Sequence, residues 1–354
     1  MMYLRNRWYV ATQSKNLGTN PMAFQLLNEQ IVIFRKENGG VVALEDRCVH
    51  RQAPLSRGEV VGDLLQCAYH GLCFDGSGHC VRVPSQKVIP PNARIRHYPA
   101  IERHGLIFIW MGLTDEPDIE ALYIFPWDED KNWHETHIHL HAHFSYLLLV
   151  DNLMDLSHLA YLHKSTIGTD AVAENAKQKS ELAGERVRVS RWMAGIDQAP
   201  THIELSGYTG KVDRWQYIEF CPPGYFWVQT GSAMAGKGGA NAKGKDLLIK
   251  RNSVHMVVPE TETTTNYYYT TVHKRGTLSE EREQIFKDRM TQTFCEDVEL
   301  LEHLSRQAKP ESPKIDLAAD AGALQARSIL DGLIAAQTNQ EFPDQPAPSP
   351  DVVI

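Results

Sequence analysis

The chain has 354 residues, of which 42% are hydrophobic and 23% charged, a balance typical of globular proteins with one or two domains. The net charge of −8 without any basic run argues against nucleic acid as a partner, and no apolar run approaches the ~20 residues of a membrane helix. The N-terminal stretch has no signal peptide pattern, and six cysteines form no disulfide framework, so we expect a cytoplasmic protein.

The first part of the chain predicts short β-strands joined by tight turns. Residues 25–46 hold two β-rich runs on either side of Asn38-Gly39-Gly40, a hairpin signal. Residues 71–85 repeat the pattern around a turn at 75–78, and residues 105–112 read as a closing strand. These runs predict a small antiparallel β domain over residues 1–114.

The second part predicts a larger α+β domain over residues 115–340. After an acidic linker, residues 136–150 read as a strand and 151–163 as a helix, and four more strand-like runs follow between 186 and 274. A long helix is predicted over 277–307, where Thr277 and Glu280 suggest a capping box, and a shorter one over 319–337. The Pro-rich residues 341–354 predict a poorly ordered or extended tail.

Four metal-binding side chains lie in two short motifs of the first part. Cys48-Val49-His50 and Cys67-Ala68-Tyr69-His70 each offer one thiol and one imidazole from a tight loop. Zinc accepts two cysteines and two histidines, and so does a Rieske [2Fe–2S] cluster, in which one iron takes both cysteines and the other both histidines. Because each loop supplies one of each kind, the order favours a cluster held between two loops.

A second set of polar side chains lies in residues 151–163. Asp151, Asp155 and His158 share one stripe of an ideal helix, whereas His163 lies about 140° further round. If both histidines hold one ion, the helix must therefore end or bulge between them. We interpret Asp151 as structural.

An acidic side chain far along the chain is predicted to be buried. In the helix at 277–307, Asp297 lies on the apolar face, whereas Glu296 and Glu299 point elsewhere. A carboxylate on that face is costly unless it is paired or bound to a metal. The apolar positions are spaced by three and four residues: Phe286, Met290, Phe294, Leu301 and Leu304.

From the NRWYVA stretch at its start to residue 320, the chain resembles the oxygenase subunits of Rieske non-haem iron oxygenases. The resemblance is strongest to the group that includes vanillate O-demethylase, dicamba O-demethylase and toluenesulfonate methyl-monooxygenase. It implies a Rieske β domain followed by a catalytic domain of helix-grip type, with an antiparallel sheet flanked by helices. The cluster ligands that it implies are Cys48, His50, Cys67 and His70.

The resemblance also implies the ligands of a mononuclear Fe(II). His158 and His163 match the family's D-x-x-H-x-x-x-x-H motif, which begins at Asp155, and Asp297 matches its F-x-E-D segment. Two imidazoles and one carboxylate leave the opposite side of Fe(II) open for dioxygen and substrate. Asn152 occupies a family position near the iron, and we leave its role open.

Asp155 is expected to connect subunits. Its helical position places it within hydrogen-bonding reach of the His158 imidazole. In the family, the equivalent aspartate bridges this histidine to a cluster histidine of a neighbouring subunit. The resemblance therefore implies that Asp155 contacts His158 and the neighbouring chain's His70, and that the chain forms a homotrimer.

Three further residues are candidates for the substrate pocket. His255 aligns with a position that faces the substrate carboxylate in dicamba O-demethylase, and Trp227 and Gln229 lie in a strand expected to line the same cavity. The histidines of residues 137–143 lie on one face of a strand, where zinc binding is conceivable. We interpret them as a polar strand face that in part borders the cavity.

These features predict a terminal oxygenase component. It takes electrons from NAD(P)H through a separate flavin and [2Fe–2S] reductase, and it uses dioxygen to hydroxylate or demethylate a methyl or methoxy group. The relatives act on aromatic anions, so we expect a carboxylate or sulfonate on the substrate. Dihydroxylation of an aromatic ring is the alternative. A zinc-binding protein without activity and a pure electron carrier are more remote.

Overall fold

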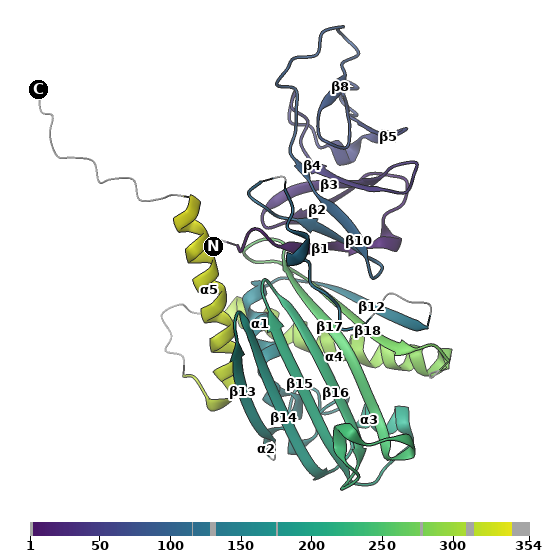
Figure 1. Cartoon of the computed structure of the whole chain (residues 1–354), viewed down its shortest axis with the longest axis vertical. Helices are drawn as coiled ribbons and strands as arrows, with labels where there is room; N and C mark the ends of the chain where they lie inside the picture. The colour runs from purple at the N-terminus through teal and green to yellow at the C-terminus, as the bar shows by residue number, and fades with distance from the viewer. Residues whose placement is uncertain are drawn as a thin grey trace, which may run out of the picture.

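The computed structural model of the protein describes residues 3–114, 116–127, 132–174, 176–276, 279–308 and 315–341. Along the long axis of the molecule, small β-sheets occupy one end and a large twisted sheet with helices behind it occupies the other (Figure 1). The predicted tail after residue 341 and the predicted helix start at Thr277 lie outside the described residues.

Three small antiparallel sheets form the first part. Asn38-Gly39-Gly40 and the 75–78 turn join neighbouring strands, which confirms both hairpin predictions. In the order in which they pair, the strands are β1 (Trp8–Gln13), β11 (Leu106–Trp110) and β10 (Ala100–Arg103); β2 (Met22–Leu26), β3 (Glu29–Arg35), β4 (Val41–Glu45) and β9 (His97–Tyr98); β5 (Glu59–Val61), β6 (Leu64–Gln66), β7 (Cys73–Phe74) and β8 (Cys80–Arg82).

A seven-stranded antiparallel sheet forms the second part. Its order is β12 (Trp133–Ala142), β18 (Thr265–Lys274), β17 (Leu247–Pro259), β16 (Tyr225–Met234), β15 (Val212–Cys221), β14 (Arg186–Ile196) and β13 (Lys177–Ala183). Strands β12 and β13 follow one another in the chain but form opposite edges of the sheet. The segment that connects them, residues 143–176, must therefore cross the whole sheet.

Five α-helices lie among the described residues: α1 (Tyr146–Met154), α2 (Asp170–Glu174), α3 (Pro200–Ser206), α4 (Glu280–Gln307) and α5 (Ala321–Glu341). Short 3-10 turns add η1 (Ser14–Asn16), η2 (Leu55–Arg57), η3 (Ile119–Ala121), η4 (Ser157–Ala160), η5 (Gly239–Asn241), η6 (Gly244–Asp246) and η7 (Ala318–Asp320). Figure 1 shows α4 running across the back of the sheet. Within these ranges no helix is long and apolar enough to cross a membrane.

Two predicted helix boundaries were wrong. The helix expected over 151–163 begins earlier and ends at Met154. Its end follows from Asp155, whose carboxylate accepts hydrogen bonds from the Ser157 N–H (2.8 Å) and the Ser157 hydroxyl (2.8 Å), a local arrangement that competes with helical bonding. Helix α4 begins at Glu280 and is capped by Ser279, whose hydroxyl accepts a hydrogen bond from the Arg282 N–H, so the capping box predicted from Thr277 and Glu280 is wrong.

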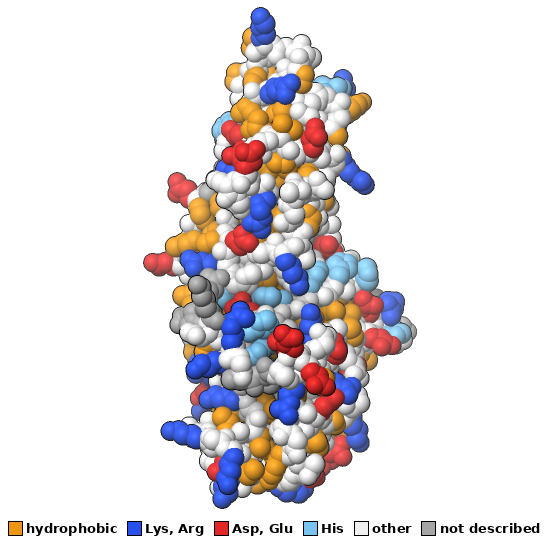
Figure 2. Space-filling model, turned by 90° about the vertical axis from the view of Figure 1, so that its right-hand side faces the viewer, with side chains coloured by type: hydrophobic (Ala, Val, Ile, Leu, Met, Phe, Trp, Pro, Cys, Tyr) orange, Lys and Arg blue, Asp and Glu red, His pale blue; other side chains and the backbone are white. Residues whose placement is uncertain are grey.

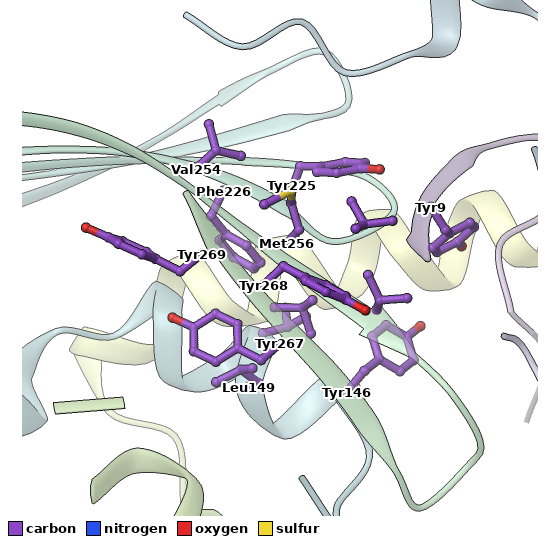
Figure 3. Close-up of a cluster of buried hydrophobic side chains, with 14 of the residues drawn as sticks. Tyr9, Tyr146, Leu149, Tyr225, Phe226, Val254, Met256, Tyr267, Tyr268 and Tyr269 are labelled. Atoms are coloured by element: carbon purple, nitrogen blue, oxygen red, sulfur yellow. The ribbon is translucent and has the colours of Figure 1, made fainter. Parts of the chain in front are cut away.

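Buried tyrosines join the two parts of the molecule. Tyr9, Tyr225 and Tyr268 belong to one hydrophobic cluster that spans both parts (Figure 3). The Tyr225 hydroxyl donates to the Trp8 carbonyl (2.7 Å), and the Tyr268 hydroxyl donates to the Ala11 carbonyl (2.6 Å). The register of β1 on β11 shifts between Val10 and Thr12, so Tyr268 supplies a donor at the resulting bulge.

Replacing Tyr268→Phe leaves the Ala11 carbonyl buried without this donor. We expect the free energy of unfolding to fall by about 1–3 kcal/mol, measured by urea unfolding. Tyr161→Phe is the control, because the Tyr161 side chain is 72% exposed. Equal stabilities of the two variants would show that the Tyr268 bond does not join the two parts.

Candidate active site

The four predicted cluster ligands come from two loops with the same backbone pattern. In the first loop, the Cys48 N–H donates to the Ala53 carbonyl (2.9 Å), and the Gln52 N–H donates to the Cys48 carbonyl (2.9 Å). In the second loop, the Cys67 N–H donates to the Leu72 carbonyl (2.8 Å), and the Gly71 N–H donates to the Cys67 carbonyl (3.0 Å). Gln52 and Gly71 both have positive φ, 59° and 71°. The loops are therefore structurally equivalent, as the matched Cys and His spacing predicts.

The side chains of these loops fit a two-iron cluster. Cys48 and Cys67 are both buried, whereas His50 and His70 are exposed, with ring centres 4.6 Å apart. Burial, together with the nearby Cys67, raises the pKa of the Cys48 thiol to about 11. Thiolates at this place therefore need the positive charge of a metal. Two inner thiols and two outer imidazoles match the asymmetric ligands of a Rieske cluster.

The structure brings His158, His163 and Asp297 together, as predicted. Their ligand atoms lie within 4.8 Å of one another. The His163 Nε2 atom is 3.0 Å from Asp297 Oδ1, and the His158 Nε2 atom is 3.5 Å from the same oxygen. His163 and Asp297 are buried, and His158 is half-buried. Two imidazoles and one carboxylate form the donor set of a non-haem Fe(II) site.

The break before His158 allows both imidazoles to face Asp297. Because α1 ends at Met154, the Asp155 carbonyl is free to lie 2.6 Å from His158 Nδ1, which leaves His158 Nε2 toward the carboxylate. The expected hydrogen bond from the Asp155 carboxylate to His158 is wrong, because that carboxylate caps Ser157. Helix α1 ends before His158, and the 3-10 turn η4 that carries His158 ends at Ala160, so the break predicted between the two histidines is present and a second one precedes them.

A glycine lets the loop close behind His163. The N–H groups of Thr166 (3.0 Å) and Gly168 (2.8 Å) both donate to the His163 carbonyl. A Cβ atom on Gly168 would lie 1.9 Å from the Leu159 carbonyl oxygen and 2.9 Å from that of His163. The backbone at residue 168 therefore approaches the chain more closely than any other residue type permits.

Two further side chains support the ligands. Glu296, which was expected to point elsewhere, lies with Oε2 2.7 Å from His163 Nδ1, so that prediction was wrong. Carboxylates in this position orient a metal-binding histidine. Asn152 donates from Nδ2 to Asp297 Oδ1 (3.0 Å), which places it beside the three ligands. Asp151, predicted to be structural, pairs with Arg327 at 2.7 Å through both oxygens.

The charges of this group stabilise one another. Burial raises the pKa of Asp297, but hydrogen bonds and charge from His158 and His163 outweigh it and lower the pKa to about 2. Burial lowers the pKa of His163, yet Asp297 and Glu296 raise it above its ordinary value. In the metal-free protein, protonation of His163 therefore supplies the positive charge that a bound metal ion would otherwise place beside Asp297.

A partly open cavity lies beside these ligands. His158, His163 and Asp297 all line it, and so does His255, whose Nδ1 lies 2.6 Å from the Tyr267 hydroxyl. Burial lowers the pKa of His255 to about 3, so its imidazole is neutral at pH 7. The cavity wall is largely apolar, with Leu153, Leu156, Leu205, Ile218, Val228, Phe286, Met290 and Phe294.

Gln229 and Trp227 are not among the residues that line this cavity, so that prediction was wrong. Side chains alternate along a strand, and in β16 it is Val228 and Thr230 that face the cavity. Gln229 instead donates to Asn252 Oδ1 (3.0 Å). Reasoning from the sequence also missed Arg214, Gln216 and Arg251, although Arg251 lies four residues before His255 on the same face of the strand.

The histidines of residues 137–143 form a polar strand face, as predicted, but they do not line the cavity. His137, His139 and His141 bond separately to Thr270 (2.9 Å), Asn266 (2.8 Å) and Glu260 (2.7 Å). Figure 2 shows histidine side chains gathered across the middle of the face on which the edge strand β12 lies.

Two family models match the chain. The Rieske [2Fe–2S] domain matches residues 7–99, and the vanillate O-demethylase oxygenase C-terminal domain matches residues 140–336. A putative toluene-4-sulfonate monooxygenase system iron–sulfur subunit from Comamonas testosteroni is 34% identical, over 97% of this chain and all of the relative. A vanillate O-demethylase oxygenase subunit from a Pseudomonas strain is 33% identical, over 95% of this chain and 96% of the relative.

The chain belongs to the oxygenase subunits of Rieske non-haem iron oxygenases. A structure of dicamba monooxygenase bound to 3,6-dichlorosalicylic acid has a TM-score of 0.87 and 29% identity, and covers 96% of this chain and 99% of that one. The same enzyme with non-haem iron and dicamba has a TM-score of 0.77 and 25% identity, over 96% of this chain and all of that one.

Membership confirms the predicted fold class and the enzyme class, a Rieske-type oxygenase related to monooxygenases and O-demethylases of aromatic acids. Its two cofactors are a Rieske [2Fe–2S] cluster and a mononuclear iron. As an oxygenase component, it requires a reductase. The domain boundary expected between residues 114 and 115 stays a prediction.

The raised pKa of His163 predicts a pH-dependent effect of Asp297→Asn in metal-free protein. The stabilisation from protonated His163 is complete below its unfolded pKa of about 6.5 and is lost as the pH rises through the folded pKa. The stabilisation from Asp297 is complete above about pH 4 and is lost as the pH falls through about 2. Asp297→Asn should therefore destabilise by about 2 kcal/mol near pH 6, and by less at high pH.

Urea unfolding after removal of the mononuclear metal measures this difference. Glu299→Gln is the control, because this exposed side chain lies on the same helix. A loss of stability for Asp297→Asn that is the same at pH 6 and pH 9 would exclude a charged pair between Asp297 and His163.

Proposed function

We propose that the chain is a terminal oxygenase component that hydroxylates or demethylates a methyl or methoxy group on an aromatic acid. One oxygen atom of dioxygen enters the substrate C–H bond and the other leaves as water, which consumes two electrons and two protons. The observation that carries the proposal is the position of His158, His163 and Asp297 on the wall of a largely apolar cavity. That position brings an aromatic ligand next to the metal-binding atoms.

In this proposal, His158, His163 and Asp297 hold Fe(II), which supplies the site where dioxygen is reduced. The chain's own groups keep the ligands in place. Glu296 fixes the His163 ring through Nδ1, the Asp155 carbonyl fixes the His158 ring, and Asn152 donates to Asp297. The apolar wall orients the substrate ring and excludes water from the reacting methyl group.

Cys48, Cys67, His50 and His70 hold the Rieske cluster in this proposal. A flavin and [2Fe–2S] reductase delivers electrons from NAD(P)H to it, one at a time. The exposed His50 and His70, together with Tyr69, which is 64% exposed, leave this end of the molecule open to partners. The complete set of iron ligands on a cavity speaks against a pure electron carrier.

We further propose that the chain forms a homotrimer in which Asp155 approaches the neighbouring chain's His70. The half-buried Asp155 carboxylate bonds only to Ser157 in the part of the chain that the structure describes. Each oxygen of the Asp155 carboxylate can accept a further hydrogen bond besides the one from Ser157. Asp155 would then connect the cluster of one subunit to the iron ligand His158 of the next, with its carboxylate toward the cluster and its backbone carbonyl 2.6 Å from His158 Nδ1.

The proposed substrate is an aromatic carboxylate or sulfonate. The names of the relatives mention toluene-4-sulfonate and vanillate, and a dicamba monooxygenase has the same fold. His255 lies on the cavity wall and remains a candidate for substrate contact through its Nε2 atom. Dihydroxylation of a ring uses the same iron ligands, and analysis of the product distinguishes the two reactions.

His158→Ala removes one proposed iron ligand. We expect the visible absorption of the cluster to remain, mononuclear iron to be lost, and turnover of a methoxylated aromatic acid to fall at least about 100-fold. Iron content and product formation coupled to dioxygen uptake measure these effects. His143→Ala is the control, because His143 is exposed and lies outside the cavity. Undiminished turnover in His158→Ala would refute the ligand assignment.

Asp155→Asn tests the proposed connection between subunits. The amide oxygen can still accept the bond from the Ser157 N–H, so both metals should stay bound. Electron transfer from the reduced cluster to the iron site should slow about tenfold or more, because a charged link in the path is lost. Rapid-mixing absorption of the cluster during a single turnover measures this rate. Asp170→Asn, at an exposed side chain, is the control, and equal rates in both variants would contradict the proposal.

A further inference from the structure

Two arginine side chains line the active-site cavity without a hydrogen-bond or ion-pair partner among the described residues. They are Arg214 of β15, which is 1% exposed, and Arg251 of β17. Among the described residues neither guanidinium makes a hydrogen bond or an ion pair, and the buried Arg214 Nε, Arg214 Nη1 and Arg251 Nε atoms have no acceptor. Burial of an unpaired charge is costly, so these donors call for an anion that the protein itself does not supply.

The two arginines belong to one polar region of the sheet. Strand β16 lies between their strands, with Ser232 opposite Arg214 and Thr230 opposite Arg251. Gln216, also opposite Thr230, lines the same region, and its buried Oε1 atom has no hydrogen-bond donor. The Thr230 hydroxyl and the two guanidinium groups therefore offer donors in this part of the cavity.

The charges around this region favour an anion. His202 of α3 lines the cavity, and burial, together with the charges of Arg214 and Arg251, lowers its pKa, so it is neutral. Asp297 is the only carboxylate among the described residues that line the cavity. Glu283 lies near Arg251, but its carboxylate bonds to Thr136 (2.9 Å) and His134 (2.5 Å). Among the described residues that line the cavity, no carboxylate therefore neutralises the charges of Arg214 and Arg251.

The register of the sheet places both arginines at one end of the cavity and His255 at the other, because the pair of Ile218 and Val228 lies between them along the strands. Arg251 precedes His255 by four residues in β17, which is about 13 Å along a strand. Helix α4 covers the same distance, since Phe286 lies 3.6 Å beneath the Arg251 guanidinium and Phe294 packs against His255 at 5.6 Å. Phe286 and Phe294 are eight residues apart, about 12 Å of helix. Asp297 follows Phe294 by one turn.

The wall between these two ends is apolar. Ile218 and Val228 pair with each other on neighbouring strands, and both line the cavity between the arginines and His255. Met290 of α4 lines the opposite side. The cavity thus offers cationic donors at one end, an apolar middle, and metal-binding side chains at the other end. A ligand that matches all three has an anionic group, an aromatic body and a reactive group in line.

We propose that Arg214 and Arg251 form an anion-binding subsite for the carboxylate or sulfonate of the aromatic substrate. The ring then lies against the apolar middle of the cavity, and the methyl or methoxy group faces His158, His163 and Asp297. This inference rests on the proposed function and deepens it. It moves the main anion contact from His255, which is neutral and already bonded to Tyr267, to two cations whose planar donors match carboxylate and sulfonate oxygens.

Equilibrium binding without turnover tests the subsite. The purified protein with both metals is titrated calorimetrically, without dioxygen and reductase. The probes are para-toluenesulfonate, para-methylbenzoate and a methylnaphthalenesulfonate, each beside its neutral amide. We expect at least one anion to bind about 10- to 100-fold more tightly than its amide, the range for hydrogen bonds to charged groups. The sulfonate and carboxylate probes show which anion is preferred.

Arg214→Met and Arg251→Met should each remove most of this preference and leave the affinity for the amides unchanged. Lys250→Met is the matched control, because Lys250 precedes Arg251 but is exposed on the other face of β17. A merely structural role predicts loss of stability, whereas an unpaired buried cation replaced by methionine should leave the urea midpoint unchanged or raise it.

The subsite is refuted if the wild-type protein binds no probe anion more tightly than its amide, or if both variants keep the preference. Its failure is distinct from failure of the proposed function. Anion binding that depends on Arg214 and Arg251, without any oxygenated product, would leave the subsite standing and refute the oxygenase proposal. Turnover with no preference for charge would refute the subsite alone.

Discussion

The burial of the Asp297 carboxylate between two imidazoles is the constraint on which the second half of the molecule depends. A carboxylate that is 5% exposed needs cations or donors on every side. His158, His163 and Asn152 supply them from the segment between β12 and β13, and Glu296 holds His163 from the same helix as Asp297. The helix and the segment are thereby fixed to each other at the metal-binding atoms.

The sheet topology explains why these groups meet. Because β12 and β13 lie at opposite edges, the chain between them must cross the sheet, and α4 packs across the same side. The space left between the sheet and α4 becomes the cavity. The loops of Cys48 and Cys67 are positioned differently, by short strands and repeated backbone bonds. One fold therefore holds two metal centres by two independent means.

The sequence predicted the ligand sets well, because spacing and helical period report directly on them. Asp297 on the apolar stripe of a helix was identifiable from its neighbours alone. The end of α1 at Met154 was not, since it depends on a side-chain bond of Asp155 that competes with helical periodicity. The prediction of which β16 side chains face the cavity was wrong for a similar reason. A shift of one residue exchanges Gln229 for Val228, and only pairing with β17 fixes it.

The central claim is that the cluster and a mononuclear iron at His158, His163 and Asp297 occupy the same chain. Electron paramagnetic resonance of the dithionite-reduced protein exposed to nitric oxide tests it most directly, because nitric oxide binds a ferrous ion with an open position. The account predicts two signals together, the rhombic signal of a reduced Rieske cluster and that of a high-spin iron–nitrosyl, which disappears in Asp297→Ala. A colourless protein that contains zinc and gives neither signal would contradict it.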